Sequence, residues 1–259
     1  MQAFIAVIVF LLGLGFGSFA NVLIYRIPRR LSFVASRSYC PNCGKLIRAY
    51  DDIPLLSYLL LRGCCRDCGE RISFRYPLVE LTTGLLFLGV FWHNGWEWRA
   101  ELLPQLLLVT VLVVISGIDL DEQIIPNRIV IPGLIAGLIA MGIVAGVRGD
   151  AWIAGRAAIG AAIGAGFLGL IALAVPRGMG MGDAKLAAFI GAFLGFYVLA
   201  ALLLAFLAGS IVGIALIGFG RRGRRDRIPF GPFLATGAVL ALFWGEPLYR
   251  FYRSLFNLG

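Results

Sequence analysis

The chain has 259 residues, of which 60% are hydrophobic and only 14% are charged, and its formal net charge at pH 7 is +9. A soluble domain of this length buries a core with far less apolar content, so the composition predicts a polytopic membrane protein and excludes an ordinary soluble one. Positive charge also fits nucleic-acid binding, but membrane proteins collect Lys and Arg in their cytoplasmic loops, and the distribution of these residues decides between the two.

Eight apolar segments predict an all-α fold with about eight transmembrane helices. In chain order they are 3–24, 78–92, 102–118, 129–147, 157–175, 184–197, 199–219 and 231–248. Several are shorter than the ~20 residues that cross a bilayer, and the run 186–219 is too long for one crossing, so it divides near Tyr197. Glycines spaced four residues apart allow helix backbones to approach closely. Such pairs are Gly13/Gly17, Gly160/Gly164, Gly191/Gly195 and Gly209/Gly213.

The first helix is apolar from its start and meets its first basic residue at Arg26, which reverses the order of a secretory signal peptide. We therefore expect a retained helix whose N-terminus lies outside the cytoplasm. The cytoplasmic segments are then 25–77, 119–128, 176–185 and 220–230, and they hold ten, one, two and five Lys or Arg, which is 18 of the 23 in the chain. This asymmetry favours the orientation. It also explains the positive charge, because basic cytoplasmic loops contact anionic lipids, and nucleic-acid binding is not needed to account for it.

Five cysteines fall within the most basic segment. Four of them form the pattern Cys40-Pro-Asn-Cys43, then 21 intervening residues, then Cys65-Arg-Asp-Cys68. Two such pairs supply four thiolates, which form a closed tetrahedral zinc site. A small loop with little apolar core needs such a constraint, and a reducing cytoplasm disfavours disulfides. We therefore predict a structural zinc ion at Cys40, Cys43, Cys65 and Cys68, with unliganded cysteines as the alternative. The spare Cys64 is expected to pack as a small apolar residue.

Two acidic residues lie at the edges of apolar segments, on the face that this topology makes cytoplasmic. Asp119 closes one segment, and Asp183 follows the run Gly178-Met-Gly180-Met-Gly182. Carboxylates at the edge of a membrane core are costly and usually functional. Two of them, one activating water and the other protonated, provide the groups for aspartyl protease chemistry. The alternative for Asp183 is an ordinary acid at a helix N-terminus.

Residues near Asp119 and Asp183 affect how this pair of acids is interpreted. Asp121 and Glu122 are rivals to Asp119, but they lie further into the loop. Gly180 and Gly182 lack side chains, so a substrate backbone could dock there.

Glu80 is another acid at a membrane edge, expected to pair with Arg75 or another basic loop residue. Paired membrane acids also relay protons, so a transporter or scaffold with a zinc loop is the alternative from another class, although no symmetric broken helices support it.

Taken together, these motifs resemble one family, the bacterial type IV prepilin peptidases, also called leader peptidase/N-methyltransferases. The resemblance covers nearly the whole chain in order. Besides the two cysteine pairs it is carried by Gly17-Ser-Phe-Ala-Asn-Val22, Asp51-Asp-Ile-Pro-Leu-Leu-Ser57, Arg75-Tyr-Pro-Leu-Val-Glu80, Ile118-Asp through Ile125-Pro126, Gly180-Met-Gly-Asp-Ala-Lys-Leu186 and Ile228-Pro-Phe-Gly-Pro232.

The resemblance implies a multi-pass protein of the bacterial inner membrane with a periplasmic N-terminus. It implies a GxGD-type aspartyl protease that uses Asp119 and Asp183, and it selects Asp119 over Asp121. The implied reaction cleaves the basic leader of prepilins and secretion pseudopilins after a glycine, at the cytoplasmic face. Methylation of the new N-terminal residue by S-adenosylmethionine is also implied, although no sequence fingerprint locates that site. A peptidase without methyltransferase activity is the alternative.

We predict three parts: a first transmembrane helix (1–24), a cytoplasmic zinc loop associated with methylation (25–77), and a transmembrane protease core (78–259). The chain departs from the family pattern at Asn127, where Asp is frequent, and at Asp52, where Asn is usual. Charge alone makes four acids of the loop candidates for attracting the lysines of a leader peptide. They are Asp51, Asp52, Asp67 and Glu70.

Overall fold

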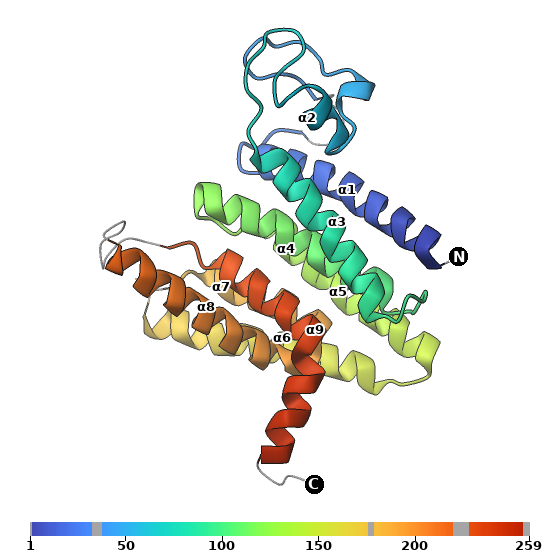
Figure 1. Cartoon of the computed structure of the whole chain (residues 1–259). Coiled ribbons are helices and arrows are strands. Elements are labelled where there is room, and N and C mark those ends of the chain that lie inside the picture. The colour runs from blue at the N-terminus through green and yellow to red at the C-terminus, as the bar shows by residue number, and fades with distance from the viewer. Residues whose placement is uncertain (1, 33–37, 176–178, 220–227, 256–259) are drawn as a thin grey trace. The chain divides into compact units, whose positions relative to one another are not determined.

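The computed structural model describes residues 2–32, 38–175, 179–219 and 228–255 (Figure 1). These residues form helices and turns with two isolated β-bridges, and they contain no β-strand. The all-α prediction is therefore confirmed, and each of the eight predicted segments contains a helix. The chain divides into two compact units, Met1–Trp98 and Arg99–Gly259.

The first unit contains two long helices and the loop between them. α1 spans Gln2–Arg26 and α3 spans Arg75–His93; the loop carries a short 3-10 turn at Ala49–Asp51 and the one-turn helix α2 at Leu56–Leu60. This unit thus pairs the segment 78–92 with the first helix.

Glycines set the approach of α1 to α3. A methyl group at Gly13 would lie 2.8 Å from the Cα of Gly84, and one at Gly17 would lie 2.6 Å from the Cα of Glu80. Because the facing residue moves back along α3 as one moves forward along α1, the two helices are antiparallel. Asn21 extends the same register, since its Nδ2 donates a hydrogen bond to the carbonyl of Tyr76 at 3.0 Å.

The described residues of the second unit form six α-helices. They are α4 (Leu102–Glu122), α5 (Asn127–Arg148), α6 (Trp152–Ala174), α7 (Met181–Leu194), α8 (Val198–Gly218) and α9 (Gly231–Leu255). In Figure 1 they run alongside one another. α7 and α8 are separated by a 3-10 turn at Gly195–Tyr197, close to the predicted division at Tyr197. Gly195 has φ +57°, a conformation that side chains disfavour, and this ends α7.

α7 is the centre of this unit. It has 14 residues, or about 21 Å of helix, and ten of them are buried. A helix that is apolar on all sides is stable only when surrounded by protein, and α7 contacts α4, α5, α6, α8 and α9. Close contact with α6 requires small residues, because a methyl at Gly160 or Gly164 would overlap the α7 backbone.

Five helical segments of the described chain are long and apolar enough to cross a membrane: α1, α4, α5, α6 and the stretch Met181–Gly218, which joins α7 and α8. The protein is therefore a multi-pass membrane protein by helix length and composition. The eight crossings that the sequence predicts exceed this number and stay a prediction.

Candidate active site and metal site

Asp119 lies in the last turns of α4, and its side chain is 5% exposed. Its Oδ2 accepts a hydrogen bond of 2.8 Å from the backbone N–H of Gly231, the first residue of α9. The first N–H groups of a helix lack partners within the helix and carry partial positive charge. The carboxylate of Asp119 therefore caps a helix that begins 112 residues further along the chain.

Gly231 also makes room for this acid. A Cβ at that position would lie 2.8 Å from Oδ2 of Asp119 and 3.1 Å from its Cγ. Any side chain there would displace the carboxylate. The sequence analysis quoted Gly231 within Ile228-Pro-Phe-Gly-Pro232 but gave it no role; its position at the start of a helix was the one available signal.

Asp183 is the third residue of α7, and its side chain is 9% exposed. Its Oδ2 accepts the N–H of Gly180 at 3.1 Å, and its own N–H donates to the carbonyl of Gly180 at 3.1 Å. These two bonds close the first turn of α7 from both sides. Asp183 therefore does stabilise the start of a helix, as the alternative interpretation predicted. That role does not explain why a second buried acid lies nearby.

The structure brings Asp119 and Asp183 together. α4 contacts α7, and the two carboxyls are near enough to interact electrostatically. Each acid accepts a backbone hydrogen bond at Oδ2. The rivals Asp121 and Glu122 are exposed. A buried carboxyl pair can share a proton and hold a water molecule.

The two candidate docking glycines have different surroundings. A Cβ at Gly182 would lie 3.0 Å from the Cβ of Ile125, so close packing alone explains why this position has no side chain. A Cβ at Gly180 would come no nearer than 3.5 Å to another atom, that atom being Oδ2 of Asp183. Gly180 is therefore the better candidate for a substrate contact. Nearby, Asn127 accepts a hydrogen bond of 3.0 Å from Nζ of Lys185 through its Oδ1.

In the first unit, the four predicted zinc ligands form one cluster. The sulfur atoms of Cys40, Cys43, Cys65 and Cys68 all lie within 4.8 Å of one another, and those of Cys40 and Cys68 are 3.8 Å apart. A tetrahedron of thiolates at about 2.3 Å from a zinc ion has sulfur atoms about 3.8 Å apart. The donor set and its spacing therefore fit zinc.

Both cysteine pairs have the same backbone form. Cys40 and Cys65 each donate from N–H to a carbonyl five residues on, at 2.9 and 2.8 Å, and each accepts from the glycine four residues on. Those glycines, Gly44 and Gly69, have φ of +70° and +71°, which side chains disfavour. N–H donors from Cys43 and Asn42 lower the pKa of the Cys40 thiol to about 7, which favours the thiolate that zinc binds.

Cys64 is outside this cluster; its Sγ donates to the carbonyl of Arg62 at 3.7 Å. Three of the four loop acids also have partners. Arg66 donates to both carboxylate oxygens of Asp51 at 2.7 to 3.1 Å, and this lowers the pKa of Asp51. Lys45 pairs with Asp67 at 3.0 Å, and Asn42 donates to Glu70 at 3.4 Å. For Asp52, the fourth acid, the described residues include no hydrogen-bond or ion-pair partner.

Among the described residues, Glu80 has no ion pair with Arg75 or with another basic residue of the loop, although such a pair was expected. Its carboxylate accepts hydrogen bonds from the N–H of Leu55, at 2.8 Å, and from the hydroxyl of Ser18. The side chain is 8% exposed and lines a pocket in the first unit. In the described part of the loop, the group that reaches this acid at the start of α3 is a backbone N–H.

Comparisons with known proteins agree on one group. A family model described as "Bacterial Peptidase A24 N-terminal domain" matches residues 11–94, and one described as "Type IV leader peptidase family" matches residues 106–217. Curated proteins named "Prepilin leader peptidase/N-methyltransferase" are similar over most of their length. The protein from Bacillus subtilis (strain 168) is 39% identical over 252 residues, with 96% of this chain and 98% of the relative covered.

Two further relatives with the same name extend this result. The protein from Myxococcus xanthus (strain DK1622) is 45% identical over 259 residues, with 95% of this chain and 75% of the relative covered. The one from Pseudomonas aeruginosa is 37% identical over 275 residues, with coverages of 93% and 91%. No solved structure matches this chain.

Proposed function

This chain belongs to the type IV leader peptidase family, and we propose that it cleaves the leader peptides of prepilins and secretion pseudopilins and then methylates the new N-terminal residue. The observation that supports proteolysis most directly is the pair of buried carboxyls, Asp119 and Asp183, from two helices that contact each other. Their burial, pairing and backbone anchoring fit the requirements of an aspartyl protease.

In the proposed mechanism the two acids share one proton. The ionised carboxylate removes a proton from water as that water attacks the scissile carbonyl, and the protonated carboxyl donates a hydrogen bond to the carbonyl oxygen. The N–H of Gly231 holds Asp119, and the N–H of Gly180 holds Asp183. Both side chains are thereby fixed before the substrate arrives, which reduces the entropic cost of reaching the transition state.

We further propose eight membrane crossings with the acid pair at the cytoplasmic face. The helices of the second unit support this by their directions. Asp119 lies near the end of α4, whereas Asp183 and Gly231 lie in the first turns of α7 and α9 beside it. α6 is antiparallel to α7, because Gly160 faces Gly191 and Gly164 faces Ala187. Successive helices therefore alternate toward and away from the acid pair.

The orientation places the basic segments on the side of the acid pair, in a bacterial inner membrane. A prepilin presents an apolar helix after a basic leader, so the helix can lie within the membrane while the leader stays at the cytoplasmic face. Prepilins, pseudopilins and membrane lipids are the proposed partners.

Two small molecules belong to this proposal. Zinc held by Cys40, Cys43, Cys65 and Cys68 would fix the loop and take no part in catalysis, because four thiolates leave no open coordination position. S-adenosylmethionine supplies the methyl group: its sulfur–methyl bond breaks, a carbon–nitrogen bond to the substrate amine forms, and the amine releases a proton to solvent.

The test is cleavage of a synthetic prepilin by the purified protein, followed by mass spectrometry. We expect a cut after glycine and an added methyl group on the product. Asp119→Asn and Asp183→Asn should each abolish cleavage, whereas Asp121→Asn, the matched exposed neighbour, should cleave at the parental rate. Parental cleavage by either of the first two variants would refute the acid pair. Cleavage without methylation would identify a peptidase only.

A further inference from the structure

One turn of helix in the loop of the first unit exposes an apolar face that the proteolytic mechanism does not use. The segment 55–61, which contains α2, has five leucines among its seven residues. Leu56, Leu59 and Leu60 have the i, i+3, i+4 spacing that places side chains on one side of a helix, and together they form the leucine face of α2. All three are exposed, Leu59 by 71% and Leu60 by 72%. Adjacent apolar side chains left exposed in this way mark a surface that contacts another protein or a membrane.

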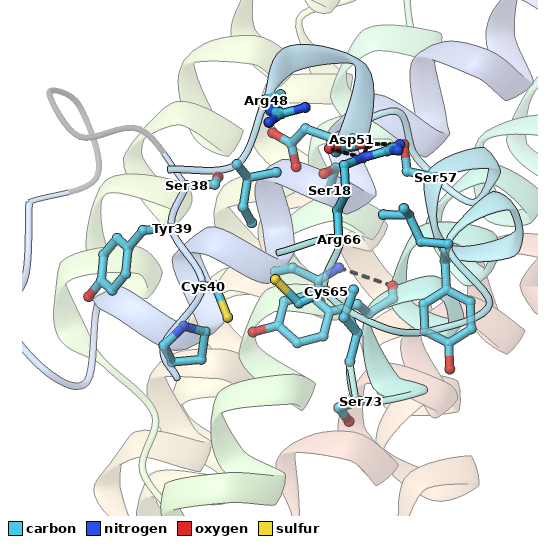
Figure 2. Close-up of a pocket in the computed structure, with 18 of the residues that line it drawn as sticks. Ser18, Ser38, Tyr39, Cys40, Arg48, Asp51, Ser57, Cys65, Arg66 and Ser73 are labelled. Carbon is cyan, nitrogen blue, oxygen red and sulfur yellow. Dashed lines mark hydrogen bonds and ion pairs between the residues drawn. The ribbon is translucent and has the colours of Figure 1, made fainter. Parts of the chain in front are cut away.

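The opposite side of α2 is already covered by the protein. Ser57 is buried, accepts a hydrogen bond from the N–H of Ile53 and donates one to the carbonyl of Tyr50, both at 3.0 Å. Ser57 and Leu61 line a pocket of about 440 Å³, and Figure 2 shows Ser57 among the residues around it. No residue of the leucine face lines this pocket. The leucine face therefore cannot turn inward without breaking the bonds of Ser57.

The start of α2 is tied to both long helices of the first unit, beside whose adjoining ends it lies in Figure 1. The carboxylate of Glu80 in α3 accepts hydrogen bonds from the N–H of Leu55, directly before α2, and from the hydroxyl of Ser18 in α1. Leu55 has φ +59°, a conformation that side chains disfavour, and strain of this kind persists where the surroundings enforce it. The loop is therefore held against the two helices at this point.

This link sets the depth of α2 in the membrane. At 1.5 Å per residue, Ser18 lies about 12 Å before Arg26, which is the last residue of α1 and the first basic residue of the chain. α1 is long and apolar enough to cross a membrane, so Arg26 marks the level of the headgroups. A loop segment that approaches Ser18 reaches the boundary between headgroups and acyl chains. Helices that lie along this boundary bury an apolar face about 5 to 10 Å deep.

The surroundings of the leucine face carry positive charge. Arg62 directly follows the leucine segment, and Arg71 forms a β-bridge with Cys64, two residues further on. Both arginines are exposed, and no described acid forms an ion pair with either. By contrast, Lys45 and Arg66 of the same loop are held in ion pairs. Guanidinium groups beside exposed leucines complement a bilayer whose apolar layer is covered by anionic headgroups.

We propose that α2 is an interfacial anchor, in which the leucine face lies among acyl chains and Arg62 and Arg71 bind anionic lipid headgroups. The partner is the surface of the membrane that α1 crosses. Because Cys65 follows Arg62 by three residues, the anchor also holds the cysteine cluster close to that surface. The proposal depends on the first unit alone, so it does not require either proteolysis or methylation.

The test places a photo-crosslinking residue, p-benzoylphenylalanine, at Leu59 or Leu60 of the full-length protein in vesicles of phosphatidylethanolamine and phosphatidylglycerol. Illumination joins the probe to whatever it touches, and mass spectrometry identifies the product. We expect lipid adducts at both positions. The control position is Leu46, a loop leucine with 57% exposure that lies between Cys43 and the leucine segment. It should give at most about a tenth as much lipid adduct, because only an interfacial face reaches the acyl chains.

A second measurement tests the charge. Arg62→Gln should lower the yield of phosphatidylglycerol adduct at Leu60 about fivefold, since a basic side chain strengthens contact with an anionic surface by about that factor. Arg48→Gln removes the same charge from a guanidinium that already donates a hydrogen bond to Tyr50, and it should change the yield less than about twofold. An unchanged yield in Arg62→Gln would refute the role given to the arginines.

Other adducts would identify a different occupant. Crosslinks from Leu59 and Leu60 to the second unit, to a second copy of the chain or to a prepilin overturn the proposal. So does equal lipid labelling at Leu46, or the absence of any adduct at both positions, which would show that water surrounds the leucine face. Zinc content, measured on each variant, shows whether the loop is folded; if one probe position prevents zinc binding, the other decides. Prepilin cleavage is assayed separately, so its failure leaves the anchor standing.

Discussion

Replacing Gly231 by alanine tests whether the acid pair depends on the start of α9. Gly231 serves Asp119 twice, as an N–H donor at 2.8 Å and as a position without a side chain. An added Cβ would lie 2.8 Å from Oδ2 and 3.1 Å from Cβ and Cγ of Asp119. These distances are too short for van der Waals contact, so either the carboxylate rotates away or α9 moves, and both changes break the hydrogen bond.

The lost hydrogen bond and the added Cβ together determine how much activity and stability decrease. Losing a hydrogen bond to a charged group costs about 1.5 to 3 kcal/mol. Because that bond holds the acid in its reactive position, we expect a similar loss of transition-state stabilisation, which lowers kcat/KM roughly 10- to 150-fold. Overpacking would also lower the free energy of unfolding by about 1 to 3 kcal/mol.

The assay is the rate of prepilin cleavage, with methylation of an already cleaved pilin measured on the same sample. Methylation should stay at the parental level, because the loop predicted to serve methylation lies in the other unit. Gly209→Ala is the matched control: an added Cβ there meets Phe230 and Phe233 at 3.6 Å, which is ordinary contact. Cleavage by Gly231→Ala within about twofold of the parent would refute the reasoning.

Three other changes have defined outcomes. Cys40→Ser leaves three thiolates, so elemental analysis should show zinc loss, with methylation abolished and cleavage retained. Gly164→Ala places a methyl against the backbone of Ala187 and should lower the free energy of unfolding by about 1 to 3 kcal/mol, whereas Gly142→Ala, with open space around it, should not. Gly180→Ala should leave stability unchanged and raise the KM for prepilin; an unchanged KM would show that no substrate docks there.

The sequence predicted the helices and the metal cluster because both follow from local patterns. Apolar segments of about twenty residues specify helices wherever they pack, and two cysteine pairs approach each other through one short loop. The nearness of Asp119 and Asp183 could also be predicted, because the distribution of basic residues assigned both acids to the same face of the membrane. These inferences required no knowledge of which helices touch.

Contacts between distant segments could not be predicted in this way. The bond from Gly231 to Asp119 depends on α9 packing beside α4, and no local pattern specifies that neighbour. The hydrogen bond from Leu55 to Glu80 could not be predicted for a similar reason. An acid at a helix start suggests a basic neighbour, but the fold of the loop decides which group arrives, and here it is the N–H of Leu55.

The chemistry of the two proposed activities also fixes the order of the reactions. Before cleavage, the nitrogen to be methylated is part of an amide, which is a poor nucleophile; it becomes an amine only when the leader is removed. Asp119→Asn should therefore leave an intact prepilin unmethylated, yet methylate a pilin supplied without its leader. Cys40→Ser should give the reverse, a cleaved and unmethylated product. Methylation of an uncleaved prepilin by the Asp119 variant would contradict this order, since it requires an amine that only proteolysis creates.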